Sequence, residues 1–225
     1  MKRNITNDVN LDYWKKRWLS GDIGWHQNEV HPLLVKYYDA YSLRNENHFF
    51  FPLCGKTLDV DWILQKGHQV TCVEISEIAI EEIAKRLHIH WQMRTENNFT
   101  VYQHDKLTIY KGDYFDCVNL DIPPIDVVFD RGAFVAIDPK KREKYANIYK
   151  KLHPKKMFLV LYRYDLNAST SPPFAFEEGE IEKLLTSDFD IDKLEENEML
   201  SQAPNMQNRQ IYSFYQEVFY ASKKI

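Results

Sequence analysis

The fold is decided by the stretch HFFFPLCGKTLDVDWILQKGHQVTCVEIS, residues His48–Ser76. It predicts an apolar strand over 48–53, a turn at Gly55, a helix from about 57 to 66 that Gly67 ends, and a second strand that stops at Glu74. Because Gly55 lacks a Cβ, the main chain of the turn can approach a ligand closely. The helix directs its positive N-terminal end and free N–H groups to the same place. This stretch therefore predicts half of a ligand site in a parallel α/β sheet.

The acid at the end of the second strand is the first candidate site residue. Glu74 follows Gly55 by roughly 20 residues, the spacing at which an acid in nucleotide-binding folds receives ribose hydroxyls. A helix-capping or solvated carboxylate is the alternative interpretation of the same pattern. We interpret Glu74 as a ribose ligand.

The glycine pattern around the turn distinguishes between nucleotide cofactors. The letters CGKT resemble the end of a phosphate-binding loop, but that motif needs a glycine five positions before Gly55, where this chain has Phe50. A dinucleotide site requires three glycines as G-x-G-x-x-G, and only Gly55 is present. A cofactor with adenosine and no phosphates fits better, and S-adenosylmethionine is the common one.

Composition agrees with one soluble α/β domain. The 225 residues suit one domain over 1–225, and a net charge of −4 with a pI near 6.1 argues against a nucleic-acid partner. Three scattered cysteines favour reduced thiols, and neither a signal-like N-terminus nor a membrane-length apolar run occurs. We expect a cytoplasmic monomer without a membrane partner.

Hydrophobic patterns along the rest of the chain predict a mainly parallel sheet covered on both faces by helices, a Rossmann-like arrangement. Asn10 and Pro32 mark the starts of two N-terminal helices, so residues 1–45 are expected to form a helical cover. The predicted core strands are 48–53, 69–75, 107–112, 125–130 and 156–163. The predicted helices between them are 57–66, 76–88 and 139–152. A helix near 178–185 and two further strands close the chain.

Ligands of open α/β sheets bind outside the carboxyl ends of the strands. The candidate residues at those positions are Leu53, Gly55, Glu74, Asp113, Tyr114, Asp130 and Arg131. Asp113 is suited to accept a hydrogen bond from an adenine amino group, with Tyr114 as an apolar wall. Asp113 as a helix cap is the alternative.

Arg131 directly follows an apolar strand, where a guanidinium is costly to bury unless it meets an anion. The carboxylate of the cofactor or an anionic substrate would supply one. An internal Asp130–Arg131 pair is the alternative.

Aromatic residues suggest the remaining walls of the site. Trp14, Trp18 and Trp25 crowd into a dozen residues and predict a cover, with core packing as the alternative for Trp18. Phe174 in SPPF is the ring most suited to touch a flat substrate. His88 and His90 are two apart with no accompanying cluster, so we expect no metal site.

Taken together, the motifs resemble those of the thiopurine S-methyltransferase family of class I methyltransferases. The matching pieces, in order, are YWKKRWLSGDIGWHQ, HPLL, FFPLCGKTLDV, GHQVTCVEIS, VVFDRGAFVAI, YA and SPPF. The resemblance implies S-adenosylmethionine as cofactor and an antiparallel last strand. It implies that Trp14 contacts the cofactor, that Asp113 lies at the adenine, and that Arg131 lies between cofactor and acceptor. Trp25 replaces a family phenylalanine before HQ, which changes the dimensions of the acceptor pocket.

The expected activity is methyl transfer to the sulfur of a small aromatic or heterocyclic thiol, with Arg131 as the catalytic residue. Such thiols ionise readily, so no general base is needed. Arg209, before the last strand, is a candidate second cation. Alternatives are methyl transfer to selenium or tellurium oxyanions, hydrosulfide or halide, and a non-catalytic cofactor-binding protein.

Overall fold

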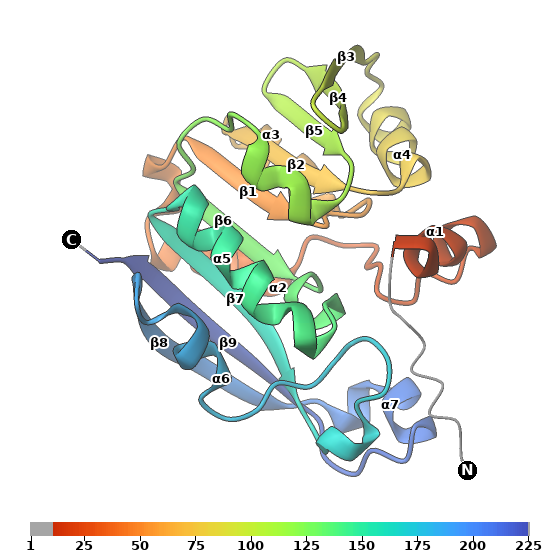
Figure 1. The fold of residues 1–225 in the computed structure, drawn as a ribbon, viewed down its shortest axis with the longest axis vertical. Helices are drawn as coiled ribbons and strands as arrows, with labels where there is room; N and C mark the ends of the chain where they lie inside the picture. Colours follow the sequence, from red (N-terminus) through yellow and green to blue (C-terminus); the bar gives the residue numbers. More distant parts are fainter. Residues whose placement is uncertain (1–10, 225) are drawn as a thin grey trace.

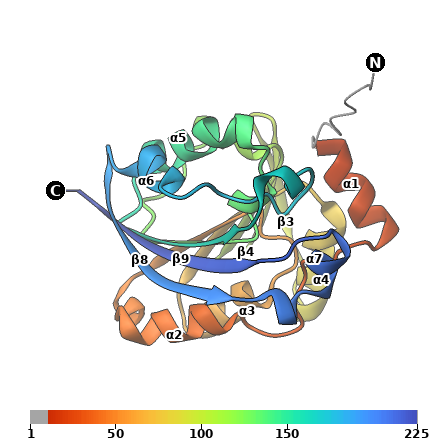
Figure 2. The ribbon, with the colours of Figure 1, turned by 90° about the horizontal axis from the view of Figure 1, so that it is seen from below.

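The computed structural model describes residues 11–224, which form a twisted nine-stranded sheet with helices on both faces (Figures 1 and 2). The strand order is β3-β4-β5-β2-β1-β6-β7-β9-β8. The strands are β1 (His48–Pro52), β2 (Gln69–Glu74), β3 (Gln92–Glu96), β4 (Phe99–His104), β5 (Leu107–Lys111), β6 (Val127–Arg131), β7 (Lys156–Arg163), β8 (Phe189–Glu198) and β9 (Tyr215–Lys223). This architecture confirms the predicted α/β fold.

Five parallel strands make the centre of the sheet, and all five were predicted. β1 pairs in parallel with β2 on one side and β6 on the other, while β5 and β7 extend the parallel set outward. Their apolar side chains are buried on both faces, as β1 shows with five buried residues out of five. Continuous apolar runs of this kind are typical of strands that lie between two helical layers.

The two edges of the sheet are antiparallel. β8 and β9 follow β7 in antiparallel order, which confirms the expected direction of the last strand. At the other edge, β3 and β4 form a hairpin that pairs with β5 and that the sequence analysis did not identify. The reason is the polar sequence of β3, QMRTE, whose side chains are mostly exposed and which therefore lacks an apolar pattern.

Helices cover the two faces of the sheet and also extend beyond it. The α-helices are α1 (Leu11–Ser20), α2 (Pro32–Ala40), α3 (Leu58–Gln65), α4 (Glu77–Leu87), α5 (Arg142–Leu152), α6 (Glu180–Leu185) and α7 (Pro204–Asn208). The 3₁₀ helices are η1 (Leu43–Asn45), η2 (Tyr114–Asn119), η3 (Phe134–Ala136), η4 (Pro139–Lys141), η5 (Leu166–Ala168) and η6 (Leu200–Gln202). None of the helices in residues 11–224 has the length and apolarity needed to cross a membrane.

Alternating side chains of the strands divide the core into two layers. Phe50 and Val128 pack with α5 and α6, whereas Phe49 and Phe51 pack with α2, α3 and α4 on the opposite face. Figure 2 shows α5 and α6 on one side of the sheet and α2 and α3 on the other. α1 lies outside both layers, beside the carboxyl ends of the parallel strands (Figure 1).

Local signals in the sequence explain where the helices begin and end. The Thr57 side chain caps α3 by accepting from Asp59 N, and Ser76 caps α4 by accepting from Ala79 N. Gly67, with φ of 91°, ends the turn after α3 as predicted. Pro32 occupies the first turn of α2. The predicted cap at Asn10 falls outside the described residues.

Candidate active site

A cavity of about 1090 Å³ opens at the carboxyl ends of the parallel strands, and residues of α1 also line it. Its volume suits a nucleoside-sized cofactor together with a small second molecule. The predicted site residues that line it are Trp14, Trp25, Leu53, Gly55, Glu74, Asp113, Tyr114 and Arg131. Phe174 does not line it.

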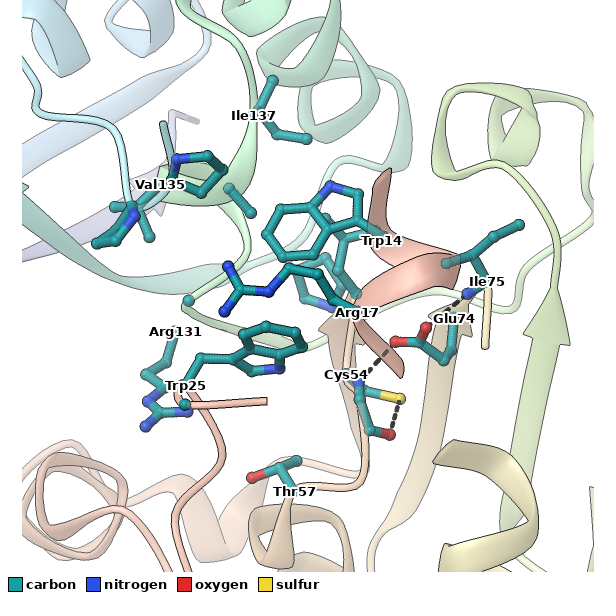
Figure 3. Close-up of a pocket in the computed structure, with 18 of the residues that line it drawn as sticks. Trp14, Arg17, Trp25, Cys54, Thr57, Glu74, Ile75, Arg131, Val135 and Ile137 are labelled. Carbon is teal, nitrogen blue, oxygen red and sulfur yellow. Dashed lines mark hydrogen bonds between the residues drawn. The ribbon is translucent and has the colours of Figure 1, made fainter. Parts of the chain in front are cut away.

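Glu74 ends β2 and is almost completely buried at the cavity. Its Oε1 accepts hydrogen bonds from the N–H groups of Ile75 (2.8 Å) and Ser76 (2.7 Å), and Oε2 accepts one from Gly55 N (2.7 Å; Figure 3). Burial raises the pKa of this carboxyl, and the three N–H donors oppose that effect. A carboxylate has about four acceptor sites, so three backbone bonds leave room for one ligand hydroxyl.

The turn between β1 and α3 brings the backbone close to the cavity. Leu53 and Gly55 both adopt positive φ, 44° and 56°. A Cβ on Gly55 would lie 3.3 Å from the Trp18 ring and 4.0 Å from Trp25 Nε1. Tryptophans of the N-terminal segment therefore lie close to the backbone at this glycine.

An acid that the sequence analysis did not select lies at the N-terminus of α3. Asp59 lines the cavity and is buried; its Oδ1 accepts from His31 N (2.7 Å) and its Oδ2 from the Thr57 hydroxyl (2.8 Å). Burial raises the pKa of Asp59, while its hydrogen bonds and the charge of Arg131 oppose the rise. A carboxylate in this first turn disfavours a ligand phosphate at the same helix end. The only sequence signal for it was its place two residues after the capping Thr57.

Asp113 and Tyr114 follow β5 and begin η2. Asp113 caps this helix, since its Oδ1 accepts from Phe115 N at 2.9 Å, so the capping interpretation is confirmed while the residue also lines the cavity. Tyr114 is buried and stacks on Tyr145 with ring centroids 4.6 Å apart. Tyr114 is thus a rigid wall.

Arg131 and Asp130 end β6 and point to opposite faces of the sheet. The Asp130 carboxylate accepts from Phe134 N (2.9 Å) and from the hydroxyls of Tyr145 (3.0 Å) and Tyr149 (2.6 Å). The alternative of an internal Asp130–Arg131 pair is therefore wrong, because neighbouring strand residues alternate in direction. Burial raises the pKa of Asp130 to about 6.

Arg131 faces the cavity on the side of α2 and α3. Its Nε is buried and has no hydrogen-bond partner within the described part of the chain. Burial lowers the pKa of His31 to about 4, and the positive charge of Arg131 adds to this effect. A guanidinium nitrogen that is buried beside a cavity without a partner marks a place where an anion or another acceptor would bind.

Three tryptophans and an arginine of the N-terminal segment cover the cavity. The Trp25 ring meets Trp14 edge-to-face at 5.3 Å and Trp18 at 5.8 Å between centroids. The guanidinium carbon of Arg17 lies 4.8 Å from the centre of the Trp25 ring, and Arg17 pairs with Asp22 at 2.9 Å. In Figure 3 the rings of Trp14 and Trp25 lie between Glu74 on one side and Arg131 and Val135 on the other.

The wall opposite the Glu74 end differs from the predicted one. Phe174 is buried away from the cavity, and the preceding residues Ser171, Pro172 and Pro173 line it instead. Tyr162, Met206 and Phe214 complete this apolar wall. The sequence analysis identified the segment that forms this wall. Residues 171–173 belong to no helix or strand, so no periodic pattern predicts which side chains of the segment face the cavity.

Arg209 also lines the cavity and holds its loop together. Its Nη2 donates to the carbonyls of Ala168 (3.0 Å) and Ser171 (3.1 Å), and its guanidinium carbon lies 5.6 Å from the centre of the Tyr164 ring. No group of three or more His, Cys, Asp or Glu side chains within residues 11–224 is placed to hold a metal ion.

Comparison with known proteins gives one consistent family. The model of the family described as thiopurine S-methyltransferase (TPMT) matches residues 9–224. The thiopurine S-methyltransferase of Acinetobacter baylyi is 34% identical over 190 residues, which cover 82% of this chain and 88% of that protein. The enzyme of the same name from Aliivibrio fischeri strain MJ11 is 33% identical over 211 residues, covering 92% and 97%.

Solved structures agree with the fold. A SAM-dependent methyltransferase from Anabaena variabilis superposes with a TM-score of 0.66 at 15% identity, covering 96% of both chains. The 1,6-didemethyltoxoflavin-N1-methyltransferase of Burkholderia thailandensis, solved with bound 1,6-didemethyltoxoflavin and S-adenosylhomocysteine, superposes with a TM-score of 0.65 at 15% identity and covers 100% of this chain and 92% of that one. Sequence, fold and cavity lead to one conclusion: the chain belongs to the thiopurine S-methyltransferase family of S-adenosylmethionine-dependent methyltransferases.

Proposed function

We propose that this protein transfers a methyl group from S-adenosylmethionine to the sulfur of a small aromatic or heterocyclic thiol. The observation that carries the proposal is one cavity with the buried carboxylate of Glu74 at one end and, at the other, a buried Arg131 nitrogen that has no hydrogen-bond partner within residues 11–224. The relatives that are at least 30% identical and carry the name thiopurine S-methyltransferase support sulfur as the accepting atom.

The residues of the Glu74 end fit a nucleoside without phosphates. Glu74 has acceptor capacity for one ribose hydroxyl, and Asp113 beside Tyr114 offers a carboxylate and a flat wall for adenine. Asp59 at the start of α3 disfavours phosphate. Trp14, Leu53 and Gly55 lie where the remaining part of the cofactor would extend toward Arg131.

The chemistry requires little from the protein beyond placement. When bound, the cofactor supplies a methyl group on a positively charged sulfur that is already activated for transfer. Arg131 stabilises the thiolate form of the acceptor and lowers the pKa of its sulfur. Trp25 and the wall of Pro172, Pro173 and Phe214 hold a flat ring and exclude water, so that the sulfur lies in line with the methyl group. No side chain has to remove a proton from an acceptor that is already ionised.

A test offers the purified protein the cofactor with thiophenol, a thiopurine, selenite, a phenol and an aniline, and identifies the products by mass spectrometry. Methylation on sulfur is the expected result, accompanied by one S-adenosylhomocysteine per product. If only selenite is methylated, the acceptor is a metalloid oxyanion and not a thiol. Cofactor binding without any methylated product would contradict the proposal.

A further inference from the structure

A buried arginine outside the reacting groups connects two walls of the cavity. Arg142 begins α5, directly after the cavity-lining Lys141, and is 2% exposed. Its partners belong to the segment 174–180 (Figure 1 shows α5 beside α6). That segment directly follows the wall residues Ser171, Pro172 and Pro173.

Arg142 makes three kinds of contact with this segment. Its Nη1 lies 2.8 Å from both carboxylate oxygens of Glu180, and its Nη2 donates to the carbonyl oxygens of Phe174 (3.3 Å) and Ala175 (2.9 Å). The guanidinium carbon lies 3.6 Å from the centre of the Phe176 ring. We call Arg142 together with Phe174, Ala175, Phe176 and Glu180 the Arg142 cluster.

The cluster fixes a segment that has no helix or strand of its own. Residues 169–179 are irregular, and buried carbonyls in such a segment need donors from elsewhere. Phe174 N donates to Val135 O at 2.7 Å, which ties the same segment to another cavity-lining residue. A buried ion pair is weak evidence for stability, because desolvation offsets much of the attraction. The Arg142–Glu180 pair instead fixes the position of the cavity wall at residues 171–173.

From these contacts we infer that Arg142 is a positioning residue that sets the width of the acceptor end of the cavity without touching substrate. The inference rests on the proposed function and deepens it. The planar guanidinium serves a carboxylate, two carbonyls and a ring at once, which the single ammonium of a lysine does not reproduce. Loosening this cluster moves the 171–173 wall, while the contacts at Glu74 stay in place.

The test compares Arg142→Lys and Glu180→Gln with Arg163→Lys as the matched control. Arg163 also pairs with two acids, Glu217 at 2.9 Å and Glu196 at 2.8 Å, but it lies outside the cavity lining. For Arg142→Lys we expect a rise of roughly tenfold in the KM for thiophenol, because small displacements at a reacting centre have large effects. The Kd for S-adenosylhomocysteine should stay within about twofold. Glu180→Gln should raise the KM for thiophenol by less than Arg142→Lys does and should also leave the Kd for S-adenosylhomocysteine within about twofold.

A second measurement does not depend on activity. Amide hydrogen exchange of residues 174–176 should become faster in Arg142→Lys and remain unchanged in Arg163→Lys, so the inference stays testable if the wild type methylates no thiol. If Arg142→Lys does not fold, Glu180→Gln provides both readouts. A folded variant with an unchanged KM for thiophenol and unchanged amide exchange of residues 174–176 would overturn the inference. A rise in the Kd for S-adenosylhomocysteine as large as the rise in this KM would also overturn it.

Discussion

Replacing Glu74 by glutamine tests the cofactor end of the cavity with the smallest change in shape. Both carboxylate oxygens accept backbone N–H groups, so the amide nitrogen of glutamine must face a donor in either orientation. The less costly orientation gives up the single bond from Gly55. The unsatisfied buried donor should lower the free energy of unfolding by about 1–3 kcal/mol. Loss of the charged acceptor for a ribose hydroxyl should weaken cofactor binding by about 1.5–3 kcal/mol, roughly 10- to 150-fold in Kd.

Isothermal calorimetry with S-adenosylhomocysteine measures the change in Kd, and urea unfolding measures the change in the free energy of unfolding. Glu77→Gln is the matched control, because Glu77 lies three residues further on, pairs with Lys111 at 3.1 Å and Tyr102 at 2.9 Å, and does not line the cavity. We expect the control to keep its Kd within about twofold. A folded Glu74→Gln protein with the wild-type Kd would refute the ribose assignment.

Three further predictions follow from the site. Arg131→Lys keeps the charge but loses the fork, so kcat/KM for a thiol should fall by about tenfold or more in steady-state assays; unchanged turnover would remove Arg131 from the reaction. The pKa of Asp130 rises on folding from 3.8 to about 6, so this carboxyl stabilises the fold less as pH increases through that range; urea unfolding of Asp130→Asn should gain about 2 kcal/mol relative to wild type between pH 4 and 6, and parallel pH profiles would contradict this. Amide exchange in residues 11–30 should slow when cofactor binds, because Trp14 and Trp25 cover the cavity; equal rates would identify the segment as fixed packing.

Much of the fold was predictable because its signals are local. Apolar runs identified the five parallel strands, and local signals such as Pro32 at the start of α2 and Gly67 after α3 located ends of helices. The β3–β4 hairpin was missed because its outer strand, β3, is polar and exposed and has no apolar pattern. Backbone pairing of β3 with β4, and of β4 with β5, defines the hairpin instead.

The same distinction holds for the site. Residues at the ends of strands were predictable, since the topology of a parallel sheet places Glu74 and Arg131 at one edge. Phe174 was not correctly assigned, because its orientation depends on Arg142 and on Val135 O, which come from other parts of the chain. Asp59 was missed for a related reason. Its carboxylate accepts a hydrogen bond from the backbone N–H of His31, which lies 28 positions earlier in the chain.

The direct test of the central claim is a methyl-transfer assay in which the methyl group of S-adenosylmethionine is isotopically labelled and thiophenol and a thiopurine are the acceptors. The account predicts label on the sulfur of these thiols and one S-adenosylhomocysteine for each labelled product. Label only on oxygen or nitrogen acceptors, with none on any thiol or on selenite, would contradict the proposed reaction and leave the fold unaffected.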